Sequence, residues 1–191
     1  MSARLTIGEL AALGEVRGVV PRHVVGDVAE DEFRCLVAEG MRSLIARSLV
    51  SDDNGAVVPH REIAPWLDVV LDPTGLLTLV TISANGSSLV TLMTAGEAFV
   101  VARHLAIGVF DLWPDSAEGV GSALADGMRQ SDPVILVLTA SAESGPRRLL
   151  ISKDLHGAYA QAVDAGDAIA ISEMDVAALV SAFVGVAALT A

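Results

Sequence analysis

The chain has 191 residues, 24 acidic against 12 basic, and a formal net charge of −12 at pH 7. A surface of this sign repels nucleic-acid phosphates and anionic membranes, so we expect neither as a partner. Apolar residues make up 52% of the chain and aromatic residues only 4%, which predicts an aliphatic core. Cys35 is the single cysteine, which excludes an intrachain disulfide and favours a cytoplasmic location.

The first segments predict helices. Thr6 and Glu9 have the spacing of a capping box and open a short helix. Residues 28–72 then predict a helix, a turn and a helix that begins at Pro59, an arrangement that resembles a small winged-helix-like module. The first of these helices is expected to pack through an apolar face that also holds Cys35 and consists of Phe33, Leu36, Val37, Met41, Leu44 and Ile45.

Strands are expected next. A hairpin around Asn85-Gly86 joins residues 76–82 and 87–94, a second pair covers 98–103 and 106–113, and a helix follows Trp113 and Pro114. A further set of strands is expected at 134–140, 148–152, about 157–161 and 168–172.

A last helix follows, capped by Ser172 and Asp175. It is apolar on nearly every side, which predicts burial on more than one face. The uncharged run from Val176 to Ala191 has 16 residues, too few to span a bilayer, so no membrane insertion is expected. The first residues show no apolar signal core.

The two strand blocks follow the same order of strands, turn, and strand running into a helix. This repeat predicts two quasi-symmetric half-units of antiparallel strands with packed helices, residues 1–131 and 132–191, within one compact α+β domain. Ser83-Ala84 should superpose on Ser141-Ala142, and the helix after Trp113 on the helix after Ser172.

Residues that could carry chemistry do not gather in the sequence. The four histidines, His23, His60, His104 and His156, lie far apart, and no metal-ligand motif is present. Gly119-Val120-Gly121 lacks the third glycine of a dinucleotide fingerprint, and Ser144-Gly145 lacks the flanking glycine of a nucleophile elbow. We therefore expect no enzyme, with no catalytic residue, no metal and no cofactor.

Four residues are candidates for contact with a partner. Trp113 closes a strand just before Pro114, and Arg147 and Arg148 form the only adjacent basic pair. Phe183 belongs to the last helix and faces either the core or a second copy of the chain. Trp113 is alternatively a core residue, and the arginine pair alternatively a solvated loop.

Several motifs resemble the EspG family, secretion-associated proteins of actinobacterial type VII (ESX) systems. They are L-T-I-G-E-L-A-A-L at residues 5–13, L-I-A-R-S-L-V at 44–50, W-L-D-V-V-L-D-P at 66–73, and the Trp113-Pro114 turn. The resemblance implies two quasi-symmetric α/β halves and a cytosolic chaperone of PE–PPE substrate pairs. This chain is shorter than the usual member, and its second half has no counterpart of residues 28–72.

Three hypotheses of function follow. The first is a non-catalytic cytosolic binding protein, a chaperone-like component of type VII secretion that recognises small helical secretion substrates. The second is a small-molecule-binding or enzymatic domain with a pocket between the halves. The third is a structural homodimer that associates through the last helix.

Overall fold

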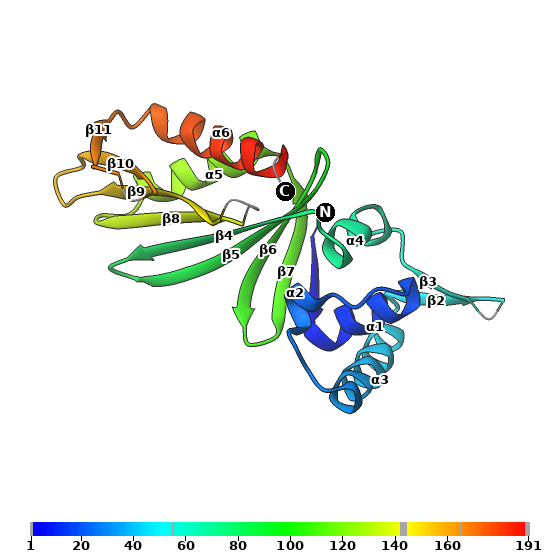
Figure 1. Ribbon diagram of the computed structural model, residues 1–191. Coiled ribbons are helices and arrows are strands. Elements are labelled where there is room, and N and C mark those ends of the chain that lie inside the picture. Colours follow the sequence, from blue (N-terminus) through cyan, green and yellow to red (C-terminus); the bar gives the residue numbers. More distant parts are fainter. Residues whose placement is uncertain (1, 55, 142–144, 165, 190–191) are drawn as a thin grey trace.

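A computed structural model describes residues 2–54, 56–141, 145–164 and 166–189. In this part of the chain, a nine-stranded antiparallel sheet carries two helices on one face and a helical unit at one end of the other face (Figure 1). The α+β class predicted from the sequence is confirmed.

The sheet is built from strands that neighbour one another in the order β1-β7-β6-β5-β4-β8-β9-β10-β11. Their bounds are β1 (Ala3–Thr6), β4 (Gly75–Ser83), β5 (Gly86–Ala95), β6 (Ala98–Ala106), β7 (Val109–Asp115), β8 (Val134–Ala140), β9 (Arg147–Lys153), β10 (Tyr159–Val163) and β11 (Ile169–Ile171). The hairpin around Asn85-Gly86 has the predicted place, whereas β1 had no counterpart in the sequence analysis.

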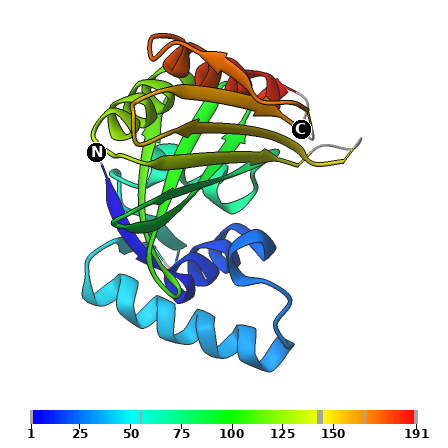
Figure 2. The same cartoon turned by 90° about the vertical axis from the view of Figure 1, so that its left-hand side faces the viewer.

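Two blocks of four strands meet at the centre of this sheet. Strands β4–β7 are followed by α5 (Ala117–Arg129), and strands β8–β11 by α6 (Asp175–Leu189). The blocks join through the antiparallel β4–β8 pair, with Val80 opposite Val137. Helices α5 and α6 lie side by side over one face of the sheet (Figures 1 and 2). The superposition of the two blocks stays a prediction, because Ala142 lies outside the described residues.

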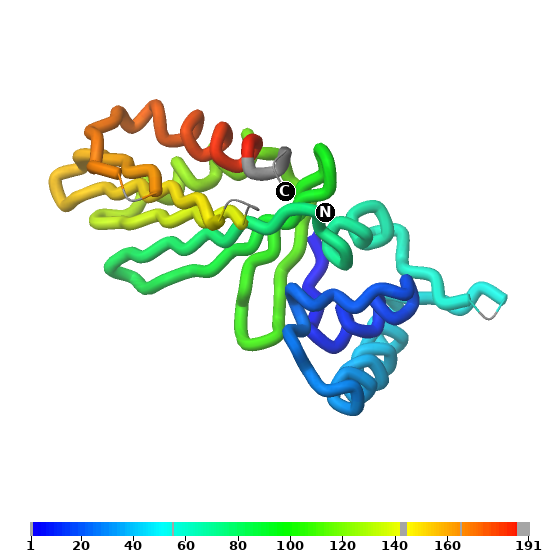
Figure 3. Tube along the Cα trace, in the orientation of Figure 1, coloured from blue at the N-terminus to red at the C-terminus, as the bar shows by residue number. Residues whose placement is uncertain are grey.

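The helical unit comes from the first third of the chain. It contains α1 (Ile7–Arg17), α2 (Arg22–Val25), α3 (Glu30–Ala46), a two-stranded hairpin of β2 (Val50–Asp53) and β3 (Ala56–Pro59), and α4 (Ala64–Leu71). The hairpin projects from the unit away from the large sheet (Figure 3).

This hairpin corrects the helix–turn–helix prediction for residues 28–72. Pro59 pairs with Val50, and the backbone N–H of His60 donates to the carbonyl of Leu49 at 2.8 Å. These contacts keep the chain extended through Pro59, so α4 begins at Ala64 and not at Pro59. A strand pair thus separates the two helices that the sequence joined by a simple turn.

The large sheet has an apolar core on each face, because successive side chains of a strand point to opposite sides. On the face covered by α5 and α6, the buried core includes Leu77, Leu79, Leu136, Leu138 and Val180. On the other face, β5–β7 pack against α1 and α4 through a second core that includes Leu10, Leu13, Leu67, Val70 and Leu112.

Over residues 175–186, helix α6 is buried on one face, which corrects the prediction of burial on several. Val176, Val180 and Val184, spaced by four residues, are fully buried, whereas Val186 is 48% exposed. The helix lies in the outermost layer, and nothing in the described part of the chain packs over its outer side (Figure 2).

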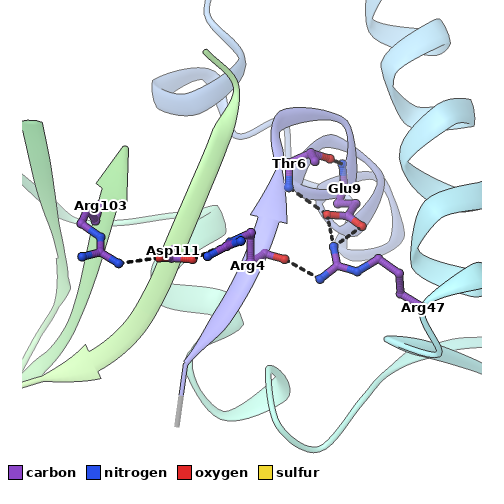
Figure 4. Close-up of polar contacts among 6 residues, drawn as sticks. All are labelled: Arg4, Thr6, Glu9, Arg47, Arg103 and Asp111. Carbon is purple, nitrogen blue, oxygen red and sulfur yellow. Dashed lines mark hydrogen bonds and ion pairs between the residues drawn. The ribbon is translucent and has the colours of Figure 1, made fainter. Parts of the chain in front are cut away.

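The start of α1 is fixed by a buried carboxylate. Thr6 and Glu9 form the predicted capping box, with the Thr6 N–H donating to Glu9 Oε2 at 2.8 Å and the Glu9 N–H donating to Thr6 Oγ1 at 3.2 Å. The Glu9 side chain is fully buried and accepts hydrogen bonds from Arg47 Nη1 at 2.7 and 2.8 Å (Figure 4). Arg47 follows the last residue of α3, so this ion pair ties the end of α3 to the start of α1.

The same contacts continue into the sheet. Arg47 Nη2 donates to the carbonyl of Arg4 on β1 at 2.7 Å (Figure 4). Arg4 Nε then donates to Asp111 Oδ1 on β7 at 2.9 Å, and Arg103 Nη2 donates to Asp111 Oδ2 at 2.7 Å. Hydrogen bonds from Arg4 and Arg103 hold the pKa of Asp111 below its ordinary value.

Helices α1 and α3 approach closely at two glycines. A Cβ atom placed on Gly40 would lie 1.8 Å from the carbonyl oxygen of Gly8, far inside van der Waals contact. A backbone oxygen cannot rotate away as a side chain can. The two helices therefore keep this distance only with glycine at position 40.

We expect Gly40→Ala to lower the free energy of unfolding by at least 1–3 kcal/mol, the usual cost of overpacking, or to detach α3 from α1. Chemical denaturation followed by circular dichroism measures this. The matched control is Gly127→Ala in α5, where an added Cβ meets no atom within 4 Å and should stabilise the helix by up to about 1 kcal/mol. Equal stability of the two variants would contradict the close approach.

We expect Glu9→Ala to cost about 2–3 kcal/mol of unfolding free energy, because the guanidinium of Arg47 and the hydroxyl of Ser43 lose their buried acceptor. Thermal and urea denaturation measure the loss. Glu15→Ala, an exposed glutamate on the same helix, should change stability by less than about 0.5 kcal/mol. A Glu9→Ala variant as stable as the Glu15 control would refute a structural role for the pair.

Candidate protein-binding surface

The aromatic residues among the predicted partner contacts lie at the edge of one core. Trp113 on β7 and Phe183 on α6 are both half-buried and pack against the core beneath α5 and α6. The Trp113 Nε1–H donates to Asp115 Oδ2 at 3.4 Å, and the Arg103 guanidinium lies 5.9 Å from the Trp113 ring centroid. Each ring is therefore held by contacts within the chain.

The two arginines do not form one patch. Arg147 and Arg148 are both exposed and are consecutive residues of β9, so their side chains point to opposite faces of the sheet. Arg147 and Trp113 lie at opposite ends of one cross-strand row, five strand spacings or about 24 Å apart. That row passes through Val101, Leu92, Leu77 and Ala140. A joint partner contact by these residues stays a prediction.

In the described part of the chain, no group of three or more His, Cys, Asp or Glu side chains is placed so that it could bind a metal ion. None of the described helices is long and apolar enough to cross a membrane. Hollows that the described residues line lie along α3 and beside α4, with volumes of about 310–440 Å³.

An open apolar surface lies on the sheet face opposite α5 and α6. Strands β4, β5, β8 and β9 each place apolar side chains there, and a set of six forms what we name the open sheet face. Its members are Val80, Ile82, Leu89, Ile135, Val137 and Leu150. The most exposed are Ile82 at 48% and Ile135 at 40%.

The register shows that these side chains are neighbours. Leu89 lies opposite Val80, Val80 opposite Val137, and Val137 opposite Leu150. These four residues form one row across four strands, about 14 Å long. Ile82 and Ile135 lie opposite each other in the next row of the same face. The open sheet face is therefore continuous and not a scatter of single exposed residues.

The surroundings of the open sheet face are uncharged on the β6 side. His104 stacks edge-on against Phe110 with ring centroids 4.9 Å apart, and its Nε2 lies 3.0 Å from Thr91 Oγ1. Burial lowers the pKa of His104 below its ordinary value, so the imidazole is neutral at pH 7. A neutral, apolar floor of this kind suits apolar side chains of a partner.

The face is open because the helical unit covers only part of it. Helix α4 packs on β5 and β6, and α1 lies near β1 and β7. In the second block, β8 follows α5 directly, so no helical unit precedes it. The described elements consequently leave the region below β8 and β9 uncovered (Figure 1).

The amino-acid sequence of β8 and β9 contains a pattern that is related to this surface. Strand β8 reads V-I-L-V-L and β9 contains L-L-I, so both strands are apolar on both faces. Such runs are typical of strands that are covered on both sides. In this chain only one side is covered by the described elements, which the sequence analysis did not detect.

Comparison with solved structures identifies the architecture. The chaperone EspG5 of the Mycobacterium tuberculosis type VII secretion system, solved in complex with a PE25–PPE41 dimer, matches with a TM-score of 0.63 and 11% sequence identity. The match covers 100% of this chain and 96% of that chain. This chain has an EspG-like fold.

The sequence comparisons add nothing to this likeness. No family model matches the chain, and no curated protein sequence matches it. At 11% identity the similarity shows the fold alone, so the fold implied by the EspG resemblance is confirmed and its function stays a proposal.

We expect substitutions at two consecutive residues of β8 to differ in their effect on stability, because the two side chains lie on opposite faces of the sheet. Leu136→Ser, which empties a fully buried site, should cost about 2–5 kcal/mol of unfolding free energy. Ile135→Ser on the open sheet face should cost less than about 1 kcal/mol. Urea denaturation of both variants measures the difference, and a similar large loss at Ile135 would show that this face is covered.

Proposed function

We propose that the protein is a non-catalytic, chaperone-like binding protein of a type VII secretion system that recognises small helical secretion substrates in the cytoplasm. The observation that carries the proposal is the open sheet face, a continuous apolar surface on an EspG-like fold. The structural neighbour EspG5 is described as a chaperone and is seen bound to a protein dimer, which supports a protein partner for this fold.

The physical argument concerns what a substrate chaperone must do. A secretion substrate that exposes apolar side chains is kept from aggregating when a second apolar surface removes them from water. Fully burying an exposed large aliphatic side chain contributes roughly 1.5–3 kcal/mol. The most exposed side chains of the open sheet face are 38–48% exposed, so each contributes less than this, and binding needs contact over the whole face. Thr78 and Thr139 form the row next to Val80 and Val137 on this face, and their hydroxyls can form hydrogen bonds with polar groups at the edge of an interface.

The hypothesis of a pocket between two halves finds less support. The halves are joined by the seven-residue β4–β8 register and share one sheet, so they do not face each other across a cleft. A homodimer through α6 and partner contacts at Trp113, Arg147, Arg148 and Phe183 stay predictions. Arg148 lies on the same side of β9 as Leu150, beside the open sheet face, whereas Trp113, Arg147 and Phe183 lie on the side of α5 and α6.

We expect the double variant Ile82→Lys/Ile135→Lys to lose affinity for a purified PE–PPE substrate pair by on the order of a hundredfold, because two lysines would have to be desolvated at the interface. Isothermal titration calorimetry measures the affinity, and circular dichroism checks the fold. The control Ile107→Lys/Leu155→Lys adds the same charge at two exposed turn residues and should bind like the unchanged chain.

Two outcomes would refute the proposal. One is that the unchanged chain binds no PE–PPE pair at tens of micromolar. The other is that both double variants bind the pair equally well, which would place the contact elsewhere.

A further inference from the structure

Helix α3 is the outermost element of the helical unit, and no other described element packs on much of its surface. It packs on α1, and of its seventeen residues only Gly40 and Leu44 are fully buried. Phe33, Leu36 and Val37, predicted from the sequence to be core, are only half-buried, and Ile45 is 61% exposed. Figures 1 and 2 show α3 at the periphery, distant from strands β8 and β9.

One flank of α3 is hollowed. A groove of about 360 Å³ lies beside the first three turns, and we name it the α3 groove. Its apolar residues are Val28, Cys35 and Leu36, and its acidic residues are Asp31, Glu32 and Glu39. Cys35 was expected to be a packed thiol, but it is exposed, because α1 covers the opposite flank of the helix near Gly40.

The carboxylates of this groove are not neutralised. No ion pair or side-chain hydrogen bond within the described part of the chain involves Asp31, Glu32 or Glu39. Of the two arginines of this helix, Arg34 is paired with Glu30 on the other flank, and Arg42 lies three residues beyond Glu39 without forming an ion pair to it. The groove thus combines an apolar floor with three free negative charges within nine residues of sequence.

The spacing of the charges selects a helical partner. Glu32 and Glu39 are seven residues apart, which is two helical turns or about 10.5 Å along the axis. Leu36 lies between them along the helix. A second helix that packs along this flank presents side chains with the same seven-residue period, so an apolar residue can meet Leu36 while cationic residues flank it.

We propose that the α3 groove is a docking site for a basic amphipathic helix of a partner protein, with an apolar stripe on Val28 and Leu36 and two lysines or arginines, seven residues apart, facing Glu32 and Glu39. The site is separate from the open sheet face and does not depend on its function. A second copy of the chain fits poorly, because α3 paired with itself would bring the carboxylates of both copies together. Nucleic acid and anionic membranes are repelled by the same charges.

The test uses the full chain and a synthetic helical peptide of 21 residues that carries a leucine stripe and lysines at seven-residue spacing. Fluorescence anisotropy measures its affinity, and alkylation of Cys35 by iodoacetamide reports occupancy, because a docked helix covers this single thiol. We expect micromolar binding that weakens at least tenfold between 0.05 and 0.5 M salt, and a severalfold slower alkylation of Cys35.

The variant Glu32→Lys/Glu39→Lys should bind this peptide at least tenfold more weakly and should instead bind a matched peptide in which glutamates replace the lysines. Glu97→Lys/Asp167→Lys changes the net charge by the same amount at two exposed residues elsewhere and should bind within twofold of the unchanged chain. The Ile82→Lys/Ile135→Lys variant should also retain peptide binding, which separates this site from the open sheet face.

Three results would overturn the proposal. Equal weakening in both acidic double variants would show attraction to the net charge alone. Peptide binding without protection of Cys35 would place the peptide elsewhere. Absence of binding by the unchanged chain at 100 μM, with circular dichroism confirming its fold, would show that the groove takes no such helix.

Discussion

The ion pair between the buried carboxylate of Glu9 and the guanidinium of Arg47 is the interaction on which the helical unit depends. An ionised carboxylate in an apolar interior is strongly unfavourable unless a cation and hydrogen-bond donors meet it. Arg47 and Ser43 at the end of α3 and the Thr6 N–H at the start of α1 supply these partners. The packing of α1 on α3 brings Arg47 to Glu9, and Gly40 makes this close approach sterically possible.

The same network fixes the unit against the sheet. Arg47 reaches the backbone of β1, and Arg4 of β1 reaches Asp111 of β7. The helical unit is thereby held over the β5–β7 part of one sheet face. Its position explains why the remaining part of that face, over β8 and β9, is open. The asymmetry between the two blocks, one with a helical unit and one without, creates the candidate binding surface.

Two surfaces of different chemistry result. The six residues of the open sheet face are aliphatic, and the charge beside them on β9 is that of Arg148, so its partners are selected mainly by apolar area and shape. The α3 groove is acidic, so its partners are selected by charge and by helical spacing. Salt should weaken binding at the α3 groove much more than binding at the open sheet face, because screening acts on charges and not on apolar contact.

Much of the local structure could be predicted from the amino-acid sequence alone. Alternating apolar residues and the Asn85-Gly86 turn indicated β4 and β5, the Thr6–Glu9 spacing indicated the start of α1, and the absence of clustered nucleophiles, bases and ligands pointed away from catalysis. These features depend on residues that are close in the chain, so they can be recognised without knowledge of the fold. Strand β1 was missed because its pairing with β7 joins residues more than 100 positions apart.

Which apolar faces are covered depends on the tertiary structure. The pattern of β8 shows that Ile135 and Leu136 point to opposite sides, but not that α6 lies over one side and that the other is left open. The spacing of Leu36 and Cys35 places them on a helix, but the crossing at Gly40 determines which flank α1 occupies. Periodicity specifies which residues share a face, whereas what covers that face depends on contacts between segments distant in sequence.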